Sequence, residues 1–303
     1  MPRTGIDYTF GITEASKSAL LELMTALGSY RNALVLVGGW VPYFLLGRYK
    51  RHDNSFEHVG SVDLDIAIDP SIIDSEQYAT IVEIIQQRGY EPRTDRMGNV
   101  IEFSFTRTIL SPVDQEEYEI TVDFLSAQIE GHRHRQVQPD LRARTMRGCS
   151  LVFEHYFEHE ITGILPENGK TTNKIKIADI VGCIATKGIA LGERYKEKDA
   201  YDIYSVVANY KEGPKDVAKE IVPFVENVFV KEGLDNIKKK FNKLQGEGPI
   251  WVATFLNPTS KEEMERIMAD AFMNVDELIR EINSLHLGSE ETFERSEGKE
   301  VRR

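Results

Sequence analysis

The feature that most constrains the fold of this chain is a short run in which acidic and apolar residues alternate. Residues 60–69 read Gly-Ser-Val-Asp-Leu-Asp-Ile-Ala-Ile-Asp. Because the side chains of a β-strand alternate between its two faces, Asp63 and Asp65 project to one side and their apolar neighbours to the other. Two carboxylates on one face repel each other unless a cation neutralises them, and magnesium prefers oxygen ligands of this kind. The run predicts either a strand that holds a divalent metal or a strand with two solvent-facing aspartates.

A second apolar run lies just upstream and ends in two glycines. Residues 33–37 read Ala-Leu-Val-Leu-Val, and Gly38 and Gly39 follow directly. Glycine lacks a side chain, so the backbone can turn tightly here and approach a phosphate group closely. Residues 40–46 have the apolar spacing of a short helix, whose N-terminal amides would face the same anion. These residues predict a phosphate-binding turn next to the acidic strand.

A third acidic position lies on one of two later strands. Residues 99–108 and 118–125 alternate between polar and apolar residues, which is typical of β-strands. Asp123 shares a face of the second strand with other polar side chains, and it is the candidate for a third metal-binding carboxylate. Glu119 and Glu102 are the reserve candidates, and the alternative for Asp123 is an exposed acid on an edge strand. Two-metal transfer of phosphoryl or nucleotidyl groups uses shared carboxylates of this kind.

The glycine pair and the acidic strand together resemble a known signature. Two glycines followed by Ser61-x-Asp63-x-Asp65 in an apolar strand are similar to the motif of the DNA polymerase β-like nucleotidyltransferases. The resemblance implies an α+β fold, with a nucleotidyltransferase-type mixed sheet and flanking helices followed by a helical C-terminal domain. The gap between Gly39 and Asp63 is longer than the usual family pattern, so residues 49–58 are expected to form an inserted loop.

The same resemblance implies roles for these residues. In the family, the glycine pair and the serine grip a nucleoside triphosphate (NTP), and three carboxylates hold Mg²⁺ or Mn²⁺ for a two-metal reaction. The residues implied to bind the NTP are Gly38, Gly39 and Ser61. The residues implied to be catalytic and to bind the metal are Asp63, Asp65 and Asp123.

A second block of charged residues is similar to one branch of this superfamily. Lys187 and Arg194 lie seven positions apart, and a Lys-Asp-Ala-Tyr-Asp run follows. This pattern resembles the AbiEii/AbiGii branch, which comprises bacterial toxins of toxin–antitoxin and phage-defence systems together with uncharacterised relatives. The resemblance implies that Lys187 contacts the nucleotide phosphates and that Asp199 and Asp202 order the cleft or take part in catalysis. Arg194 and Lys198 are counted with them as NTP-binding residues, and the alternative is an ordinary charged helix face.

Two clusters of basic residues stand out from an acidic chain. The net charge of −12 argues against a uniformly basic nucleic-acid binder. Residues 131–147 nevertheless predict either a loop that touches phosphates or a solvated surface loop, and His132-x-His134 within them is a metal-site candidate without a third ligand nearby. Residues 238–243 form a second basic cluster, a pattern usually found on a solvated helix face. The arginines of the first cluster are Arg133, Arg135, Arg142, Arg144 and Arg147.

The pattern of the chain changes along its length. Helical periodicity dominates the second half, so we predict a nucleotidyltransferase domain over 1–170, a helical domain over 171–287 and a disordered polar tail over 288–303. Cys149 and Cys183 make neither a disulfide scaffold nor a zinc site, which fits a reducing cytoplasm. No run is long and apolar enough to cross a bilayer, so no membrane partner is expected.

These observations together predict an enzyme. We expect a metal-dependent nucleotidyltransferase that moves a nucleoside monophosphate from an NTP to a hydroxyl acceptor and releases pyrophosphate. The acceptor stays open among tRNA or another RNA, a protein and a small molecule, and the toxin resemblance implies an antitoxin protein as partner. The alternative is a non-catalytic module that binds a nucleotide or a partner protein within a toxin–antitoxin or defence system.

Overall fold

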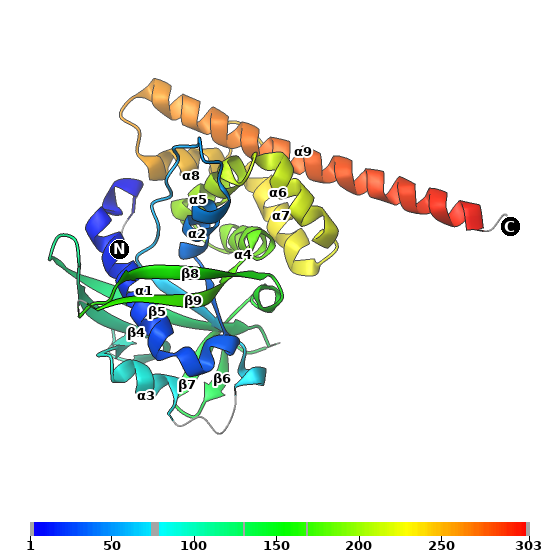
Figure 1. The fold of residues 1–303 in the computed structure, drawn as a ribbon. Helices are drawn as coiled ribbons and strands as arrows, with labels where there is room; N and C mark the ends of the chain where they lie inside the picture. Colours follow the sequence, from blue (N-terminus) through cyan, green and yellow to red (C-terminus); the bar gives the residue numbers. More distant parts are fainter. Residues whose placement is uncertain (1–2, 74–78, 130, 168, 301–303) are drawn as a thin grey trace.

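The computed structural model of the protein describes residues 3–73, 79–129, 131–167 and 169–300, with side chains as far as residue 287. Within these ranges the chain is an α+β structure, in which helices flank a mixed sheet and further helices follow it (Figure 1). The helices α4–α9 lie above the sheet in Figure 1, whereas α3 lies below it and α1 passes alongside the strands. The predicted fold class is confirmed.

The sheet contains nine strands within the described residues. Their order is β3-β4-β5-β2-β1-β9-β8, with the hairpin β6–β7 attached to β5. β2 runs antiparallel to β1 and parallel to β5, so the sheet is mixed. The strands are β1 (Leu34–Val37), β2 (Leu64–Ile68), β3 (Glu91–Thr94), β4 (Val100–Leu110), β5 (Glu117–Ala127), β6 (His134–Gln138), β7 (Leu141–Met146), β8 (Tyr156–Ile164) and β9 (Lys170–Ala178).

The two central strands are β1 and β2, the apolar run and the acidic run of the sequence. All four residues of β1 are buried, and in β2 every residue except Asp65 is buried. Branched apolar side chains suit a strand that is covered on both faces, which explains why both strands could be predicted from the sequence. Asp65 is thus a partly exposed acid in a strand that otherwise belongs to the core.

Three helices flank the sheet in the first half of the chain. The helical spacing of apolar residues over 13–30 predicts that the first of them starts at Thr13. It starts earlier, because Thr9 is its cap and the Thr9 hydroxyl accepts a hydrogen bond from the amide of Ile12. The second begins directly after Gly39, as predicted. For the third, the spacing of apolar residues predicts a helix over 75–88, but the helix observed is shorter, and residues 75–78 lie outside the described residues. The helices are α1 (Phe10–Ala26), α2 (Trp40–Tyr49) and α3 (Ile81–Gln86).

The second half of the chain is helical from Ile180 onward. β9, which starts at the predicted domain boundary, first completes the sheet. The sequence pattern predicts one helix over 215–231, but the structure has two. They are separate because residues 222–224 form a 3₁₀ turn and Pro223 cannot donate the amide hydrogen bond that would continue α6. The helices are α4 (Ile180–Glu193), α5 (Glu197–Asn209), α6 (Pro214–Ile221), α7 (Val228–Lys240), α8 (Glu247–Leu256) and α9 (Lys261–Glu300).

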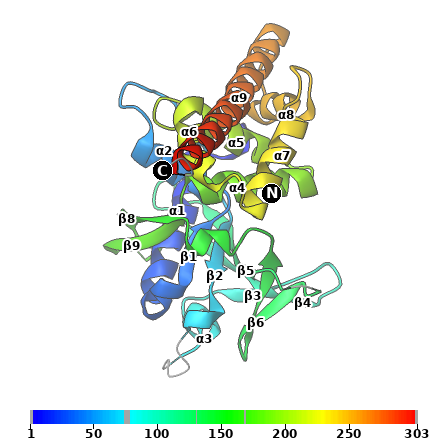
Figure 2. The ribbon, with the colours of Figure 1, turned by 90° about the vertical axis from the view of Figure 1, so that its right-hand side faces the viewer.

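The last helix, α9, lies across the other helices and then projects past them (Figures 1 and 2). The disordered tail predicted over 288–303 differs from the structure, because residues 288–300 continue α9 and 301–303 lie outside the described residues. Glutamate, which is frequent in this stretch, is a good helix former. None of the described helices combines the length and apolar composition needed to cross a bilayer. The buried side chains of α9 are Met268, Ala271, Val275, Leu278 and Ile282.

The predicted insertion joins the two halves of the molecule. Residues 50–59 leave α2 and pass along the helical half before they reach the acidic strand. Lys50 forms a β-bridge with Lys211, and the Asn54 amide nitrogen donates a hydrogen bond to Asn209 Oδ1 at 2.8 Å. The insertion is therefore anchored on the end of α5 and on the turn that follows it.

Candidate active site

The candidate site lies where the acidic strand meets β5. Asp65 pairs with Asp123 across the parallel strands β2 and β5, and Val37 pairs with Asp65 across β1 and β2. Residues paired in register point to the same face of a sheet, so the two carboxylates lie side by side. Asp63 directly precedes β2. The fold thus brings the three predicted acids to one part of the sheet.

The pKa values show that these carboxylates act on one another. Burial is the largest cause that raises the pKa of Asp123, to about 6, and the negative charges of Asp65 and Asp63 add to this effect. Burial likewise raises the pKa of Asp63, and the charge of Asp65 is the next cause. A site where carboxylates resist ionisation is one where a bound cation would be stabilised.

Residues that no motif marked partly compensate the charge of Asp123. The Ser104 hydroxyl donates a hydrogen bond to Asp123 Oδ1 at 2.5 Å, and Arg93 donates to Ser104 Oγ at 3.2 Å. The positive charge of Arg144 also lowers the pKa of Asp123. Ser104 pairs with Asp123 in the register of β4 and β5, so the strand alternation of residues 99–108 was the signal that could have found it.

The backbone of the turn at Gly38 and Gly39 packs tightly against the acidic strand. Gly38 has a φ of +73°, and a Cβ added to it would lie 2.0 Å from Asp65 Oδ2. A Cβ added to Gly39 would lie 2.5 Å from Ser61 Oγ and 3.4 Å from Lys198 Nζ. Neither position has room for a side chain, so the backbone itself passes next to Asp65 and Ser61. Gly39 is the N-cap of α2, which places the start of this helix at the same turn.

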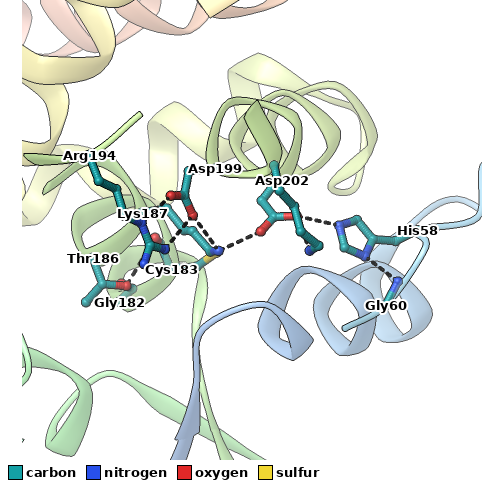
Figure 3. Close-up of polar contacts among 10 residues, drawn as sticks. His58, Gly60, Gly182, Cys183, Thr186, Lys187, Arg194, Asp199 and Asp202 are labelled. Carbon is teal, nitrogen blue, oxygen red and sulfur yellow. Dashed lines mark hydrogen bonds and ion pairs between the residues drawn. The ribbon is translucent and has the colours of Figure 1, made fainter. Parts of the chain in front are cut away.

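The residues of the second charged block form a buried network (Figure 3). Lys187 Nζ lies 3.1 Å from Asp199 Oδ1 and 2.6 Å from Asp202 Oδ2. Lys198 Nζ lies 2.8 Å from Asp202 Oδ1. Arg194 donates two hydrogen bonds to Asp199, of 2.7 and 3.0 Å. All five residues that the second block predicted therefore meet in one place.

This network is buried and yet charged. Burial opposes the charged form of Lys187, but Asp202 and Asp199 outweigh it and raise the pKa of the lysine. Burial also opposes the ionised form of Asp202, but Lys187 and Lys198 outweigh it and lower the pKa of the aspartate. Three cations and two anions leave one net positive charge. Lys187 is held between two carboxylates, whereas the Arg194 side chain is 48% exposed and is the most accessible cation of the network.

His58 joins the network from the insertion. Its Nε2 lies 3.0 Å from Asp202 Oδ1, and its Nδ1 accepts the amide hydrogen of Gly60 at 3.1 Å (Figure 3). Burial lowers the pKa of His58 to about 4, so the ring is neutral at pH 7 and donates its Nε2 hydrogen to Asp202. No local pattern marks His58, because the contact joins residues 144 positions apart.

A cleft of about 840 Å³ lies beside Asp65, the one of the three acids that lines it, and its lining also includes Gly38. The basic segment 131–147, predicted as a loop, instead contains the hairpin β6–β7 and forms one wall of the cleft. Helix α4 forms another part of the lining, with Lys187 and Arg194. The basic side chains that the segment contributes to the cleft are His132, Arg133, His134, Arg144 and Arg147.

The other sequence candidates lie away from this site. Glu102 pairs with Arg142 at 3.2 Å, and Glu119 is exposed, so Asp123 stays the third acid. The lysines of residues 238–243 are not among the residues that line the cleft. Cys149 and Cys183 are buried and unpaired.

The oxygen atoms of the three acids suit a hard divalent cation. Asp63, Asp65 and Asp123 offer carboxylates alone, and Mg²⁺ or Mn²⁺ would relieve the repulsion among them. Across the described ranges, however, no three acidic, histidine or cysteine side chains are gathered closely enough to hold an ion. His132 and His134 likewise have no third metal-binding side chain close to them among the described residues.

Comparison with known proteins gives distant structural likenesses. The chain is similar to the crystal structure of JHP933 from Helicobacter pylori, at 13% identity and a TM-score of 0.41, over 91% of this chain and 97% of that one. It is also similar to a proposed nucleotidyltransferase from H. pylori, at 13% identity and a TM-score of 0.40, over 89% and 97%. No protein-family model matches the chain, and no curated protein sequence matches it significantly. At such low scores the likenesses assign no activity, which has to be inferred from the residues of the site.

Proposed function

We propose that the protein is a metal-dependent nucleotidyltransferase that transfers a nucleoside monophosphate from an NTP to a hydroxyl group. The observation that carries this proposal is the pairing of Asp65 with Asp123 on adjacent parallel strands, directly beside the turn at Gly38. Metal-assisted chemistry at a triphosphate needs carboxylates that bind the cation next to backbone amides that can approach the phosphates.

Asp63, Asp65 and Asp123 would hold Mg²⁺ or Mn²⁺. When bound, the ion would supply positive charge that stabilises the negative charge developing on the phosphate oxygens. Burial and the neighbouring charges oppose the ionisation of Asp63 and Asp123, so cation binding and the ionisation of these two acids would favour each other.

Asp123 is the proposed general base. The acceptor oxygen would form a bond to the α-phosphorus while the bond from the α-phosphorus to the oxygen bridging to the β-phosphorus breaks. The acceptor proton would pass to a carboxylate oxygen of Asp123, and pyrophosphate would leave. No covalent enzyme intermediate is required.

The two sides of the site would bind different substrates. Ser61, Lys198 and the start of α2 converge on Gly39 and would seat the triphosphate, with Arg194 as a further cation. The arginine-bearing hairpin β6–β7 would receive the acceptor. This basic wall would suit an RNA such as tRNA, and a protein or a small molecule is the alternative acceptor.

A toxin of the AbiEii/AbiGii type is the finer form of this proposal. The support for it is that Lys187, Arg194, Asp199 and Asp202, spaced as in that branch, meet in one buried network. A cytoplasmic toxin of this type would arrest growth when expressed, and an antitoxin protein would relieve the arrest.

Transfer of a label from the NTP tests the proposal. The protein is incubated with magnesium and each of the common NTPs, labelled on the α-phosphate, together with total tRNA, cell protein or a small-molecule extract. The α-label should appear on one acceptor class, whereas a γ-label should leave in pyrophosphate. Transfer of the γ-label to an acceptor would indicate a kinase and contradict the proposal.

A second candidate function is a non-catalytic module that binds a nucleotide or a partner protein. The observation that favours it is that, in the described part of the chain, the three carboxylates are not gathered into a ready metal site. Such a module would bind an NTP without forming pyrophosphate, and the Asp63→Asn substitution would leave its function intact.

A further inference from the structure

Tyr8 lies next to the candidate site although no sequence motif marks it. It belongs to residues 3–9, which lead into α1 and include a short 3₁₀ turn, Gly5–Asp7. The Tyr8 ring packs on Phe255 of α8, with ring centroids 5.8 Å apart, and Gly5 lies against the same phenylalanine. This segment therefore joins the start of α1 to the helical half and holds the Tyr8 ring in place.

The Tyr8 ring covers a cation at the glycine turn. Lys198 Nζ lies 5.4 Å from the centroid of the ring, within the range of a cation–π attraction. The same nitrogen lies 3.4 Å from the position that a Cβ of Gly39 would take, and Ser61 Oγ lies 2.5 Å from that position. An ammonium, a hydroxyl and the start of α2 thus converge where the triphosphate would bind, with Tyr8 beside them.

Burial opposes the charged form of Lys198, and the Tyr8 ring favours it. Its side chain is 5% exposed, and burial lowers its pKa, although Asp202 at 2.8 Å opposes this effect. The face of an aromatic ring attracts an ammonium group without carrying a full negative charge. The Tyr8 ring therefore favours the charged lysine and adds no anion that would repel a phosphate.

The Tyr8 hydroxyl is the second part of this arrangement. Burial raises the pKa of Tyr8, and the negative charges of Asp202 and Asp63 raise it further, so the hydroxyl stays protonated at neutral pH. Among the described residues it forms no hydrogen bond. A protonated hydroxyl close to Asp63 is a donor that a phosphate oxygen could use.

We propose that Tyr8 is part of the NTP-binding site and acts on the β- and γ-phosphates. Its ring holds the Lys198 ammonium at the Gly39 turn, and its hydroxyl donates a hydrogen bond to a phosphate oxygen. This inference rests on the proposed function, because it assumes that an NTP binds with its triphosphate at that turn.

The test compares the binding of two nucleotides by calorimetry, in the presence of magnesium. The first is the non-hydrolysable analogue α,β-methylene-ATP, and the second is AMP, which lacks the β- and γ-phosphates. Tyr8→Phe removes the hydroxyl alone and should weaken binding of the analogue about tenfold, because a hydrogen bond to a charged group is lost. Tyr8→Leu also removes the ring and should weaken it roughly a further threefold. AMP binding should stay within about twofold of the wild-type value for both variants.

Tyr156 provides the matched control. Its ring also faces a lysine, with Lys176 Nζ 4.7 Å from the centroid, but it lies on β8, at the edge of the sheet, and not at the Gly39 turn. Tyr156→Phe and Tyr156→Leu should bind both nucleotides like the wild type. Equal weakening of AMP and the analogue, or no weakening in the Tyr8 variants, would overturn the role of Tyr8 alone. A wild-type protein that binds no analogue at all would overturn the proposed function together with it.

Discussion

Burial and the carboxylates of Asp65 and Asp63 hold the pKa of Asp123 at about 6, above its ordinary value of 3.8. At the residue scale this means that the folded protein binds a proton at Asp123 more tightly than the unfolded chain does. The stability that comes from this group is therefore fully present below about pH 4 and is lost as the pH rises through 6. A carboxylate kept in such a position costs stability at neutral pH, which is common for groups that serve a function.

Replacing Asp123 with Asn should therefore stabilise the free protein at neutral pH. Asn resembles the protonated acid, so the free energy of unfolding at pH 7.5 should rise by about 1–3 kcal/mol, and the gain should vanish near pH 4. Urea unfolding at the two pH values measures this difference. Glu119→Gln is the control, because Glu119 lies on the same strand and is exposed. A destabilised Asp123→Asn variant at pH 7.5 would show that the carboxylate has a structural role instead.

The buried ion pairs of Lys187 have the opposite effect on stability. Lys187→Met would leave Asp199 and Asp202 without one of their cations, and breaking a buried pair in this way costs about 3–5 kcal/mol. Lys174→Met removes an exposed pair with Glu158 and should cost less than about 1 kcal/mol. Equal losses in the two variants, measured by urea unfolding, would mean that the buried pairs of Lys187 contribute no more to stability than an exposed pair.

At the element scale, the turn between β1 and α2 sets the geometry of the site. The backbone at Gly38 passes so close to Asp65 that the carboxylate would have to move if any side chain were present. The positive φ of Gly38 adds a second reason for glycine, because residues with a Cβ rarely adopt it. β1, the turn at Gly38 and α2 therefore form one structural unit with the acidic strand β2.

Gly38→Ala should damage the site far more than an alanine elsewhere in the same unit. Its Cβ would lie 2.0 Å from Asp65 Oδ2, so we expect a loss of about 1–3 kcal/mol in unfolding free energy and at least about a hundredfold lower transfer activity. Gly47→Ala in α2 is the control, because a Cβ there meets no atom within 4 Å and should add up to about 1 kcal/mol of stability. Thermal unfolding and label transfer measure both effects, and an active Gly38→Ala variant would contradict the role given to the turn.

The elements that local patterns describe could be predicted from the sequence. An apolar run predicts β1, the alternation of acidic and apolar residues predicts β2, and the paired glycines predict the turn at Gly38. The hairpin β6–β7 could not be predicted, because its arginines and glutamines hide the strand pattern and composition alone indicates a loop. His58 and Tyr8 were missed for a different reason: they reach the site through contacts with residues far away in the sequence.

At the scale of the whole molecule, the sheet and the helical half contribute different charges. The sheet supplies Asp63, Asp65 and Asp123, and the helical half supplies the network of Lys187, Lys198 and Arg194. Two segments, residues 50–59 and residues 3–9, each connect the sheet to the helical half close to the site. A site built between acids on one side and cations on the other suits a ligand that carries both metal ions and phosphates.

The measurement that tests the central claim most directly is pyrophosphate release with magnesium and each common NTP, with and without total tRNA. The wild-type protein is compared with the Asp63→Asn/Asp65→Asn double variant and with Glu119→Gln as the control. The proposed function predicts release by the wild type and by Glu119→Gln, and loss of at least about a thousandfold in the double variant, because the cation would no longer be held. Pyrophosphate release that persists in a folded double variant would contradict the assignment of these aspartates, and so would an NTP-binding wild type that releases none with any acceptor class.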